Sequence, residues 1–182
     1  MPGQRRELGT SPAWYKRLPA ALQRVAEASD RVPSLPFRPG PATAQAVDEL
    51  VQVLPTGKVV EVQVRAQRIA DGICTGFRVP LVRVIVNERR PHNQRGELHG
   101  LYTPAEPPGR DTITLWMLTA KRVQVVAPKT FLRTLLHEIC HHLDYTHLHL
   151  RESLHTRGFY QRESSLFAAI AGDRVDSARA VR

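Results

Sequence analysis

Apolar residues recur at helical spacing in several parts of the chain, most clearly in its second half. From Pro128 onward they repeat every three or four residues, which predicts a helix of about 18 residues with one broad apolar face. Pro128 suits the first turn of such a helix, where its missing N–H costs nothing. A second stripe predicts a helix over residues 42–54, which ends at the Pro-Thr-Gly that follows. Further helical patterns cover residues 22–28 and 153–171.

Alternating or β-branched apolar residues predict four strands between these helices. Residues 59–64 alternate in the way of a half-buried strand, and residues 79–86 are rich in β-branched side chains. Residues 97–103 and 111–118 are two further strands, joined through a proline-rich loop as in a β-hairpin. The order of elements predicts an α+β domain, in which a short mixed or antiparallel sheet packs on the long helix and on the helix after it.

Length and composition agree with a single globular domain of this kind. The chain has 182 residues, of which 42% are hydrophobic and 24% charged, as in a globular protein of one domain. Residues 1–40 hold six prolines and predict a Pro/Arg-rich lead-in, residues 41–172 the domain, and residues 173–182 a polar C-terminal tail. No apolar run approaches the ~20 residues of a membrane helix, and no secretory signal is visible after Met1. We therefore expect a cytoplasmic protein with no membrane contact.

The chain is basic and poor in cysteine. Its net charge is +9, from 26 basic and 17 acidic residues. A diffuse basic surface suits a polyanionic partner, because neutralised phosphates release counterions, so nucleic acid is a candidate partner. Two cysteines, Cys74 and Cys140, are too few for a four-cysteine zinc site or a disulfide framework.

Six of the eight histidines lie between residues 137 and 155, and two of them belong to an HExxH motif inside the long helix. His137 and His141 are one helical turn apart and so present two imidazoles to one metal ion. Glu138 points to the rim of the same site, where it can accept a proton from a zinc-activated water. The motif predicts His137 and His141 as metal ligands and Glu138 as a general base.

A catalytic zinc site needs a third protein ligand, and the residues alone leave four candidates for it. His147 has the spacing of a metzincin, but the chain has Asp144 where that pattern has glycine, and it has no methionine downstream. His149 has no pattern behind it. Glu163 would act as the downstream glutamate of a gluzincin does. His155 stands near the expected start of the next helix.

Four polar residues around the motif have less specific interpretations. Asp144 lies on the metal-facing side of the helix, where it either orients a ligand imidazole by accepting its second N–H or stays solvated. His142 is one position round from that face and is expected to be structural. His147 and His149, if they are not ligands, are expected to be solvated loop residues.

The motif and the residues after it resemble the SprT-like and YgjP-like small zincins. HEICHH, a short connection and HTRGFYQRESSL are similar to the HExxH helix and the H-x-x-x-F segment of those families, and the two strands before the motif also fit. The resemblance covers about residues 96–167 and does not extend to residues 1–40. It implies a small zincin-like fold, zinc, His155 as the third ligand with Phe159 after it, and a peptide substrate paired with the strand nearest the cleft. Many SprT-like proteins carry a C-terminal zinc ribbon, for which this chain has too few cysteines.

Residues and resemblance together predict a zinc-dependent metallopeptidase that acts on a protein or peptide substrate. His137, His141 and His155 hold Zn²⁺, and Glu138 is the general base. Tyr160 is the best candidate donor to the developing oxyanion. Two alternatives stay open: a basic, nucleic-acid-associated binding module with a closed structural metal site, and a metal-dependent hydrolase of a non-peptide substrate. The sequence names neither the natural substrate nor the oligomeric state.

Overall fold

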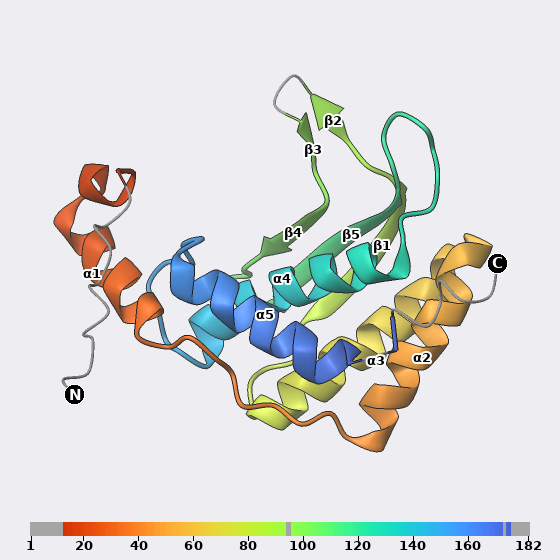
Figure 1. The fold of residues 1–182 in the computed structure, drawn as a ribbon, viewed down its shortest axis with the longest axis horizontal. Helices are drawn as coiled ribbons and strands as arrows, with labels where there is room; N and C mark the ends of the chain where they lie inside the picture. The colour runs from red at the N-terminus through yellow and green to blue at the C-terminus, as the bar shows by residue number, and fades with distance from the viewer. Residues whose placement is uncertain (1–12, 94–95, 173, 176–182) are drawn as a thin grey trace, which may run out of the picture.

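The fold comes from a computed structural model and is described for residues 13–93, 96–172 and 174–175. Within these residues the protein has five α-helices and a three-stranded mixed sheet, so it is α+β as the sequence pattern predicts (Figure 1). In chain order the elements are η1 (Tyr15–Arg17), α1 (Ala20–Asp30), α2 (Pro41–Val53), η2 (Leu54–Thr56), α3 (Val59–Phe77), β1 (Arg83–Arg89), β2 (His92–Asn93), β3 (Gly96–Glu97), β4 (Gly100–Thr103), β5 (Thr112–Leu118), α4 (Pro128–Thr146) and α5 (Arg157–Ala171).

The main sheet has its strands in the order β1-β5-β4. β1 and β5 are parallel, with Val84 opposite Ile113 and Val86 opposite Leu115. β4 and β5 are antiparallel, with Tyr102 opposite Ile113, and they form the predicted hairpin. β4 is therefore an edge strand of the described sheet, and its outer edge is not paired with another of the described strands.

The helices pack on the face of the sheet that carries the buried valine, isoleucine and leucine side chains. α3 contacts β1, whereas α4 contacts β4 and β5. α2 packs on α3 and α5 packs on α4, and Figure 1 shows α5 in front of α4. Within the described residues, none of these helices is long and apolar enough to cross a membrane. The predicted apolar face of α4 is buried throughout, at Phe131, Leu132, Leu135, Leu136, Ile139, Cys140 and Leu143.

Residues 59–64, predicted as a strand, form the first turns of α3 instead. The side chains of Val60 and Val64 are 74% and 46% exposed, whereas Val62 is fully buried. The buried stripe continues at helical spacing through Ala66, Ile69, Ala70, Ile73 and Cys74. The strand prediction is wrong because a short run of alternating valines fits both periods. Burial of the longer helical stripe outweighs the β propensity of valine.

Most of the other predicted elements form with shifted ends. The helix predicted over 42–54 is α2 followed by η2, and the chain turns at Gly57, whose φ of 73° is left-handed. The strand predicted over 79–86 forms as β1, about four residues later in the chain. Residues 97–103 divide between β3 and β4, and residues 111–118 form β5.

The last helix begins later than its pattern predicts. α5 starts at Arg157, and Thr156 caps it by accepting a hydrogen bond from the backbone N–H of Phe159. His155 therefore lies just ahead of the cap, in the loop from α4, and not on the helix itself.

The described part of the predicted N-terminal lead-in packs on the rest of the molecule. α1 contacts α5, and Leu35 belongs to the same apolar core as the sheet and helices. The ring of Phe37 stacks on the ring of Phe77, with centroids 5.5 Å apart. No break in packing thus marks residue 40 as a boundary within the described residues, and the independent folding of residues 41–172 stays a prediction.

Both cysteines are buried and unpaired. Burial raises the pKa of the Cys74 thiol to about 11, and burial also raises the pKa of Cys140. Both side chains therefore stay protonated at neutral pH and act as apolar packing groups, as expected for Cys140.

Candidate metal centre

Three histidine side chains converge beside the edge strand β4. α4 supplies His137 and His141 one turn apart, and the loop before α5 supplies His155. The Nε2 atom of His155 lies 3.0 Å from Nε2 of His137 and 3.1 Å from Nε2 of His141. One ligand atom from each residue lies within 4.8 Å of the other two. The structure thus brings together the three residues that the sequence suggested as ligands.

The spacing of these nitrogen atoms fits one metal ion. Nitrogens at the usual distance from a tetrahedral zinc ion lie roughly 3.3 Å from one another. Nitrogen lone pairs at the two short distances from His155 repel each other unless a cation or a proton lies between them. Phe159 packs against all three rings, with centroids 4.7 to 5.0 Å away. The three histidines can therefore hold a metal ion and leave a fourth position open.

A carboxylate behind His137 orients its ring. The Nδ1 atom of His137 lies 3.0 Å from Oε2 of Glu163, and Arg133 donates to Oε1 of the same carboxylate at 2.8 Å. Burial acts to raise the pKa of Glu163, but the bonds and charges of His137 and Arg133 outweigh it and hold that pKa below its usual range. Glu163 is thus an acceptor, so His137 carries its proton on Nδ1 and presents the Nε2 lone pair to the centre.

A hydroxyl and a carboxylate orient His141. Its Nδ1 atom lies 2.7 Å from Oγ of Ser153, and Ser153 donates to Oδ2 of Asp144 at 2.7 Å. Asp144 also accepts from Arg162 at 2.8 Å. Burial raises the pKa of Asp144, while Arg162 and Ser153 oppose this by stabilising the carboxylate. Since the hydroxyl proton goes to Asp144, Ser153 accepts from Nδ1–H of His141, which leaves Nε2 available to a metal.

Burial keeps two of the three histidines, His141 and His155, in the neutral form that binds metal. Burial, together with the neighbouring His137 and His155, lowers the pKa of His141 to about 3. Burial, again together with His137, also lowers the pKa of His155. Metal binding requires neutral imidazole, so at His141 protons compete with a metal ion only in strongly acidic solution.

Glu138 lies where two cavities meet. Both cavities are lined by Gly100, His137 and Glu138. One, of about 340 Å³, extends to Arg133, and the other, of about 310 Å³, extends to Tyr145. The second cavity is also lined by His141 and His155, so Glu138 and the three histidines face the same space.

The strand β4 runs close to the Glu138 side chain. A Cβ atom on Gly100 would lie 2.5 Å from Oε1 of Glu138, so glycine is what permits this approach. Burial raises the pKa of Glu138, and His137 and a hydrogen bond from the backbone N–H of Tyr102 oppose the rise. A carboxylate with a raised pKa is the stronger general base.

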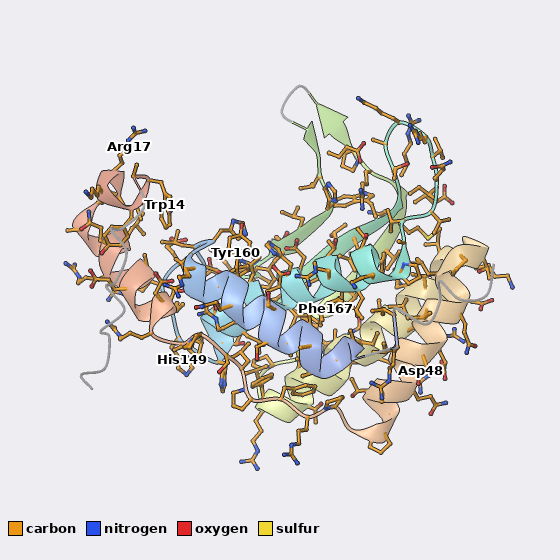
Figure 2. All side chains as sticks on the ribbon, viewed as in Figure 1. Trp14, Arg17, Asp48, His149, Tyr160 and Phe167 are labelled. Atoms are coloured by element: carbon orange, nitrogen blue, oxygen red, sulfur yellow. The ribbon has the colours of Figure 1, made fainter. Side chains whose placement is uncertain are left out.

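The remaining candidates for the third ligand are not members of the cluster. His147 ends α4 and packs on the ring of Phe77, with centroids 4.9 Å apart. His149 is exposed in the loop after α4. In Figure 2, His149 and Tyr160 lie on opposite sides of the first turns of α5. Glu163 bonds the far nitrogen of His137 and is thus the partner of a ligand.

Tyr160, the predicted oxyanion donor, is on the first turn of α5 (Figure 2). Its ring stacks on that of His155, with centroids 5.8 Å apart and an interplanar angle of 20°. The side chain is 51% exposed. Tyr160 therefore lies beside the cluster, at its solvent-exposed side.

His142 has the structural role expected of it. Its ring is fully buried and bonds the carbonyl oxygen of Pro80 at 2.8 Å and Oδ2 of Asp111 at 3.0 Å. The hydroxyl of Tyr102 donates to the same carboxylate oxygen at 2.5 Å. These bonds tie the HExxH helix to β4 and to the start of β5, and so fix the edge strand relative to the histidines.

Sequence reasoning missed three residues that hold the ligands: Arg133, Ser153 and Arg162. Neither Arg133 nor Ser153 lies at a spacing that a motif specifies. A signal did exist for Arg162, which follows Phe159 by three positions and so falls on the apolar face of the helix. A charged residue on such a face is expected to have buried partners, which the sequence alone does not name.

Comparison of the chain with models of protein families, with curated proteins and with solved structures finds no match in any of the three. The resemblance to the small zincins therefore stays a prediction from the motif, and the functional argument starts from the geometry of the site.

Removing the carboxylate of Glu163 is expected to weaken zinc binding by about 10- to 100-fold, because Nδ1 of His137 loses its acceptor. The measurement is a zinc titration of Glu163→Ala against a competing chelator. Glu152→Ala, at an exposed glutamate of the preceding loop, is the matched control and is expected to bind zinc like the wild type. Equal affinities of the two variants would contradict the role given to Glu163.

Proposed function

We propose that the protein is a zinc-dependent metallopeptidase of the small zincin type, similar to the SprT-like and YgjP-like families. One observation carries the proposal: three histidine Nε2 atoms converge next to the carboxylate of Glu138, which lines a cavity on each side. The donor set suits zinc, since three imidazoles with an open fourth position are typical of catalytic zinc sites.

In this mechanism a bound zinc ion would supply the Lewis acid that lowers the pKa of water and polarises the peptide carbonyl. Glu138 accepts a proton from the attacking water and later delivers it to the leaving amine. Burial of Glu138 suits both steps, because a raised pKa lets the carboxyl take up the proton and hold it. His137 and His141 keep their second nitrogens bonded to Glu163 and Ser153, which fixes the two rings during turnover.

An extended peptide is the substrate that the edge of β4 favours. β4 pairs with β5 on one side only, within the described sheet, and its other edge runs past Glu138. Main-chain hydrogen bonds to such an edge align a peptide without regard to most of its side chains. Tyr160 would then donate its hydroxyl proton as a hydrogen bond to the developing oxyanion from the exposed side.

The alternatives have less support. A nucleic-acid-binding module with a closed structural site would need a fourth protein ligand, for which His147 is a candidate. Within the described residues His147 packs on Phe77, and the cluster offers three ligands. A non-peptide hydrolase would use the same water activation, and the open edge of β4 is what favours a peptide over it. The basic composition keeps nucleic acid as a proposed partner.

The experiment that tests the proposal is hydrolysis of an unfolded protein substrate such as casein by the zinc-loaded full chain. We expect cleavage that a chelator abolishes and that added zinc restores. A protein that binds one zinc ion per chain and cleaves neither casein nor a mixture of peptides would refute the peptidase assignment.

Filling the space at Gly100 is expected to slow hydrolysis without loss of metal. In Gly100→Ala the new Cβ would lie 2.5 Å from Oε1 of Glu138 and 2.8 Å from Cγ2 of Thr134, so either the strand or the carboxylate must move. A misplacement of this size can lower kcat by about 10²-fold. Steady-state kinetics and zinc content are the measurements. Gly40→Ala, where a Cβ meets nothing within 4 Å, is the control.

A further inference from the structure

The end of α1 lies against the start of α5 although about 128 residues separate them in the chain (Figure 1). Here the α1 end means residues 29–32. The backbone N–H of Gly158 donates to Asp30 at 2.6 Å, and the hydroxyls of Ser29 and Thr156 bond each other at 2.9 Å. A Cβ atom on Gly158 would overlap the carbonyl oxygen of Ser29 and lie 2.7 Å from Cα of Asp30. The two backbones are therefore as close as a glycine allows.

A fully buried arginine joins the α1 end to the loop beside the metal centre. Arg162 donates from Nη1 to the carbonyl oxygens of Ser29 at 2.6 Å and Val32 at 2.8 Å. Its Nη2 atom donates to Oγ of Ser29 and to Oδ1 of Asp144, both at 2.8 Å. The carbonyl and hydroxyl acceptors on the α1 end thus fix the guanidinium in the position where it can bond Asp144.

From Asp144 the contacts continue to a ligand. The other carboxylate oxygen accepts from Ser153, whose Oγ accepts from Nδ1–H of His141. Each bond in this relay constrains the next: Arg162 holds the carboxylate, the carboxylate takes the hydroxyl proton, and the hydroxyl oxygen then sets the tautomer of His141. If the carboxylate moved away, the hydroxyl could donate to Nδ1 instead and shift the imidazole proton to Nε2.

The α1 end also holds the residue next to the third ligand, His155. Thr156 is fixed by Ser29 and by the N–H of Phe159, and it is the residue next to His155. The α1 end therefore acts on His141 through Arg162, Asp144 and Ser153, and on His155 through the cap of α5.

We propose that the α1 end is a positioning element of the metal centre, which holds His141 and His155 in the geometry that binds a metal ion. The N-terminal segment then contributes to metal affinity, and displacement of the α1 end releases the metal. Coupling of this kind is reciprocal, so a bound metal ion must in turn hold the α1 end in place. The inference rests on the metal centre of the proposed function and does not depend on peptide hydrolysis.

Gly158→Ala in the full chain is the direct test. The added Cβ forces the α1 end away from α5, whereas alanine itself suits a helix. We expect zinc affinity, measured by competition with a chelator, to fall about tenfold or more. In the wild type we also expect zinc to slow amide hydrogen exchange in residues 20–32, and we expect this protection to be lost in the variant.

Gly76→Ala is the matched control. Its Cβ would lie 2.5 Å from the ring of Phe37, so this ring of the same N-terminal segment must shift, at a point with no bond to a ligand. We expect this variant to bind zinc like the wild type. Equal zinc affinity in Gly158→Ala and wild type, or an equal loss in Gly158→Ala and Gly76→Ala, would overturn the proposal.

A double-mutant cycle tests the relay with milder changes. Arg162→Lys keeps the charge but loses the planar fork that bonds the α1 end and Asp144 together, and Ser153→Ala removes the last link to His141. We expect each single variant to weaken zinc binding, and the Arg162→Lys effect to be much smaller once Ser153 is alanine. Fully additive effects would refute the relay. If the wild type binds zinc but cleaves no peptide, the proposed function fails and these affinities still decide the inference.

Discussion

Replacing Glu138 by glutamine is expected to lower the rate of peptide hydrolysis by about 10³-fold, because the amide cannot take the proton from water. Zinc content is expected to stay at the wild-type level, since Glu138 is not one of the three converging residues. The variant keeps the shape of the buried side chain beside Gly100, so the loss can be assigned to proton transfer. Turnover of casein and zinc content per chain are measured on the same preparation.

The control for this variant is Glu106→Gln, at an exposed glutamate of the loop between β4 and β5. It is expected to retain wild-type turnover. Hydrolysis by Glu138→Gln at a rate within a few-fold of the control would remove Glu138 from the mechanism.

His155→Ala is expected to lose most of the bound zinc and all zinc-dependent hydrolysis. The Nε2 atom of His155 is the one that lies within 3.1 Å of both other ligand nitrogens, so its removal leaves two imidazoles on one helix. Two ligands on adjacent turns hold zinc far less firmly than three. Metal analysis after extensive dialysis measures the loss, and His147→Ala is the matched control, expected to retain the metal.

Zinc retained in His155→Ala and lost in His147→Ala would contradict the ligand assignment. It would favour the metzincin spacing instead, with the loop after α4 rearranged to bring His147 away from Phe77.

The HExxH helix could be predicted because local rules and tertiary packing agree there. Proline at the first turn and an apolar stripe at helical spacing both favour a helix, and the whole stripe is buried in the fold. The pairing of His137 and His141 then follows from helix geometry alone. The third ligand could not be obtained in this way, since His155 lies in a loop whose path depends on tertiary contacts.

The start of α3 shows where local pattern fails. Val60, Val62 and Val64 would share one face of the predicted strand, but on the helix Val60 and Val64 are exposed and Val62 alone of the three is buried. A run of six residues is too short to separate a period of two from a period of 3.6 when β-branched residues occupy most of it.

The residues behind the ligands could not be predicted because they come from distant parts of the chain. Arg162 bonds Ser29, which is 133 positions earlier, and Ser153 acts only through the fold of the loop between α4 and α5. Of these contacts, the sequence suggested one alone, as one of two interpretations of Asp144: a carboxylate that orients a ligand imidazole. In the fold it does so through Ser153, with no direct bond to the ring.

The most direct test of the central claim is the metal content of the purified wild-type protein, measured by elemental analysis together with His137→Ala, His141→Ala and His155→Ala. The converging nitrogens predict about one zinc ion per wild-type chain and a loss in all three variants. No stoichiometric metal in the wild type, or an unchanged content in the three variants, would contradict the metal centre and with it the proposed peptidase.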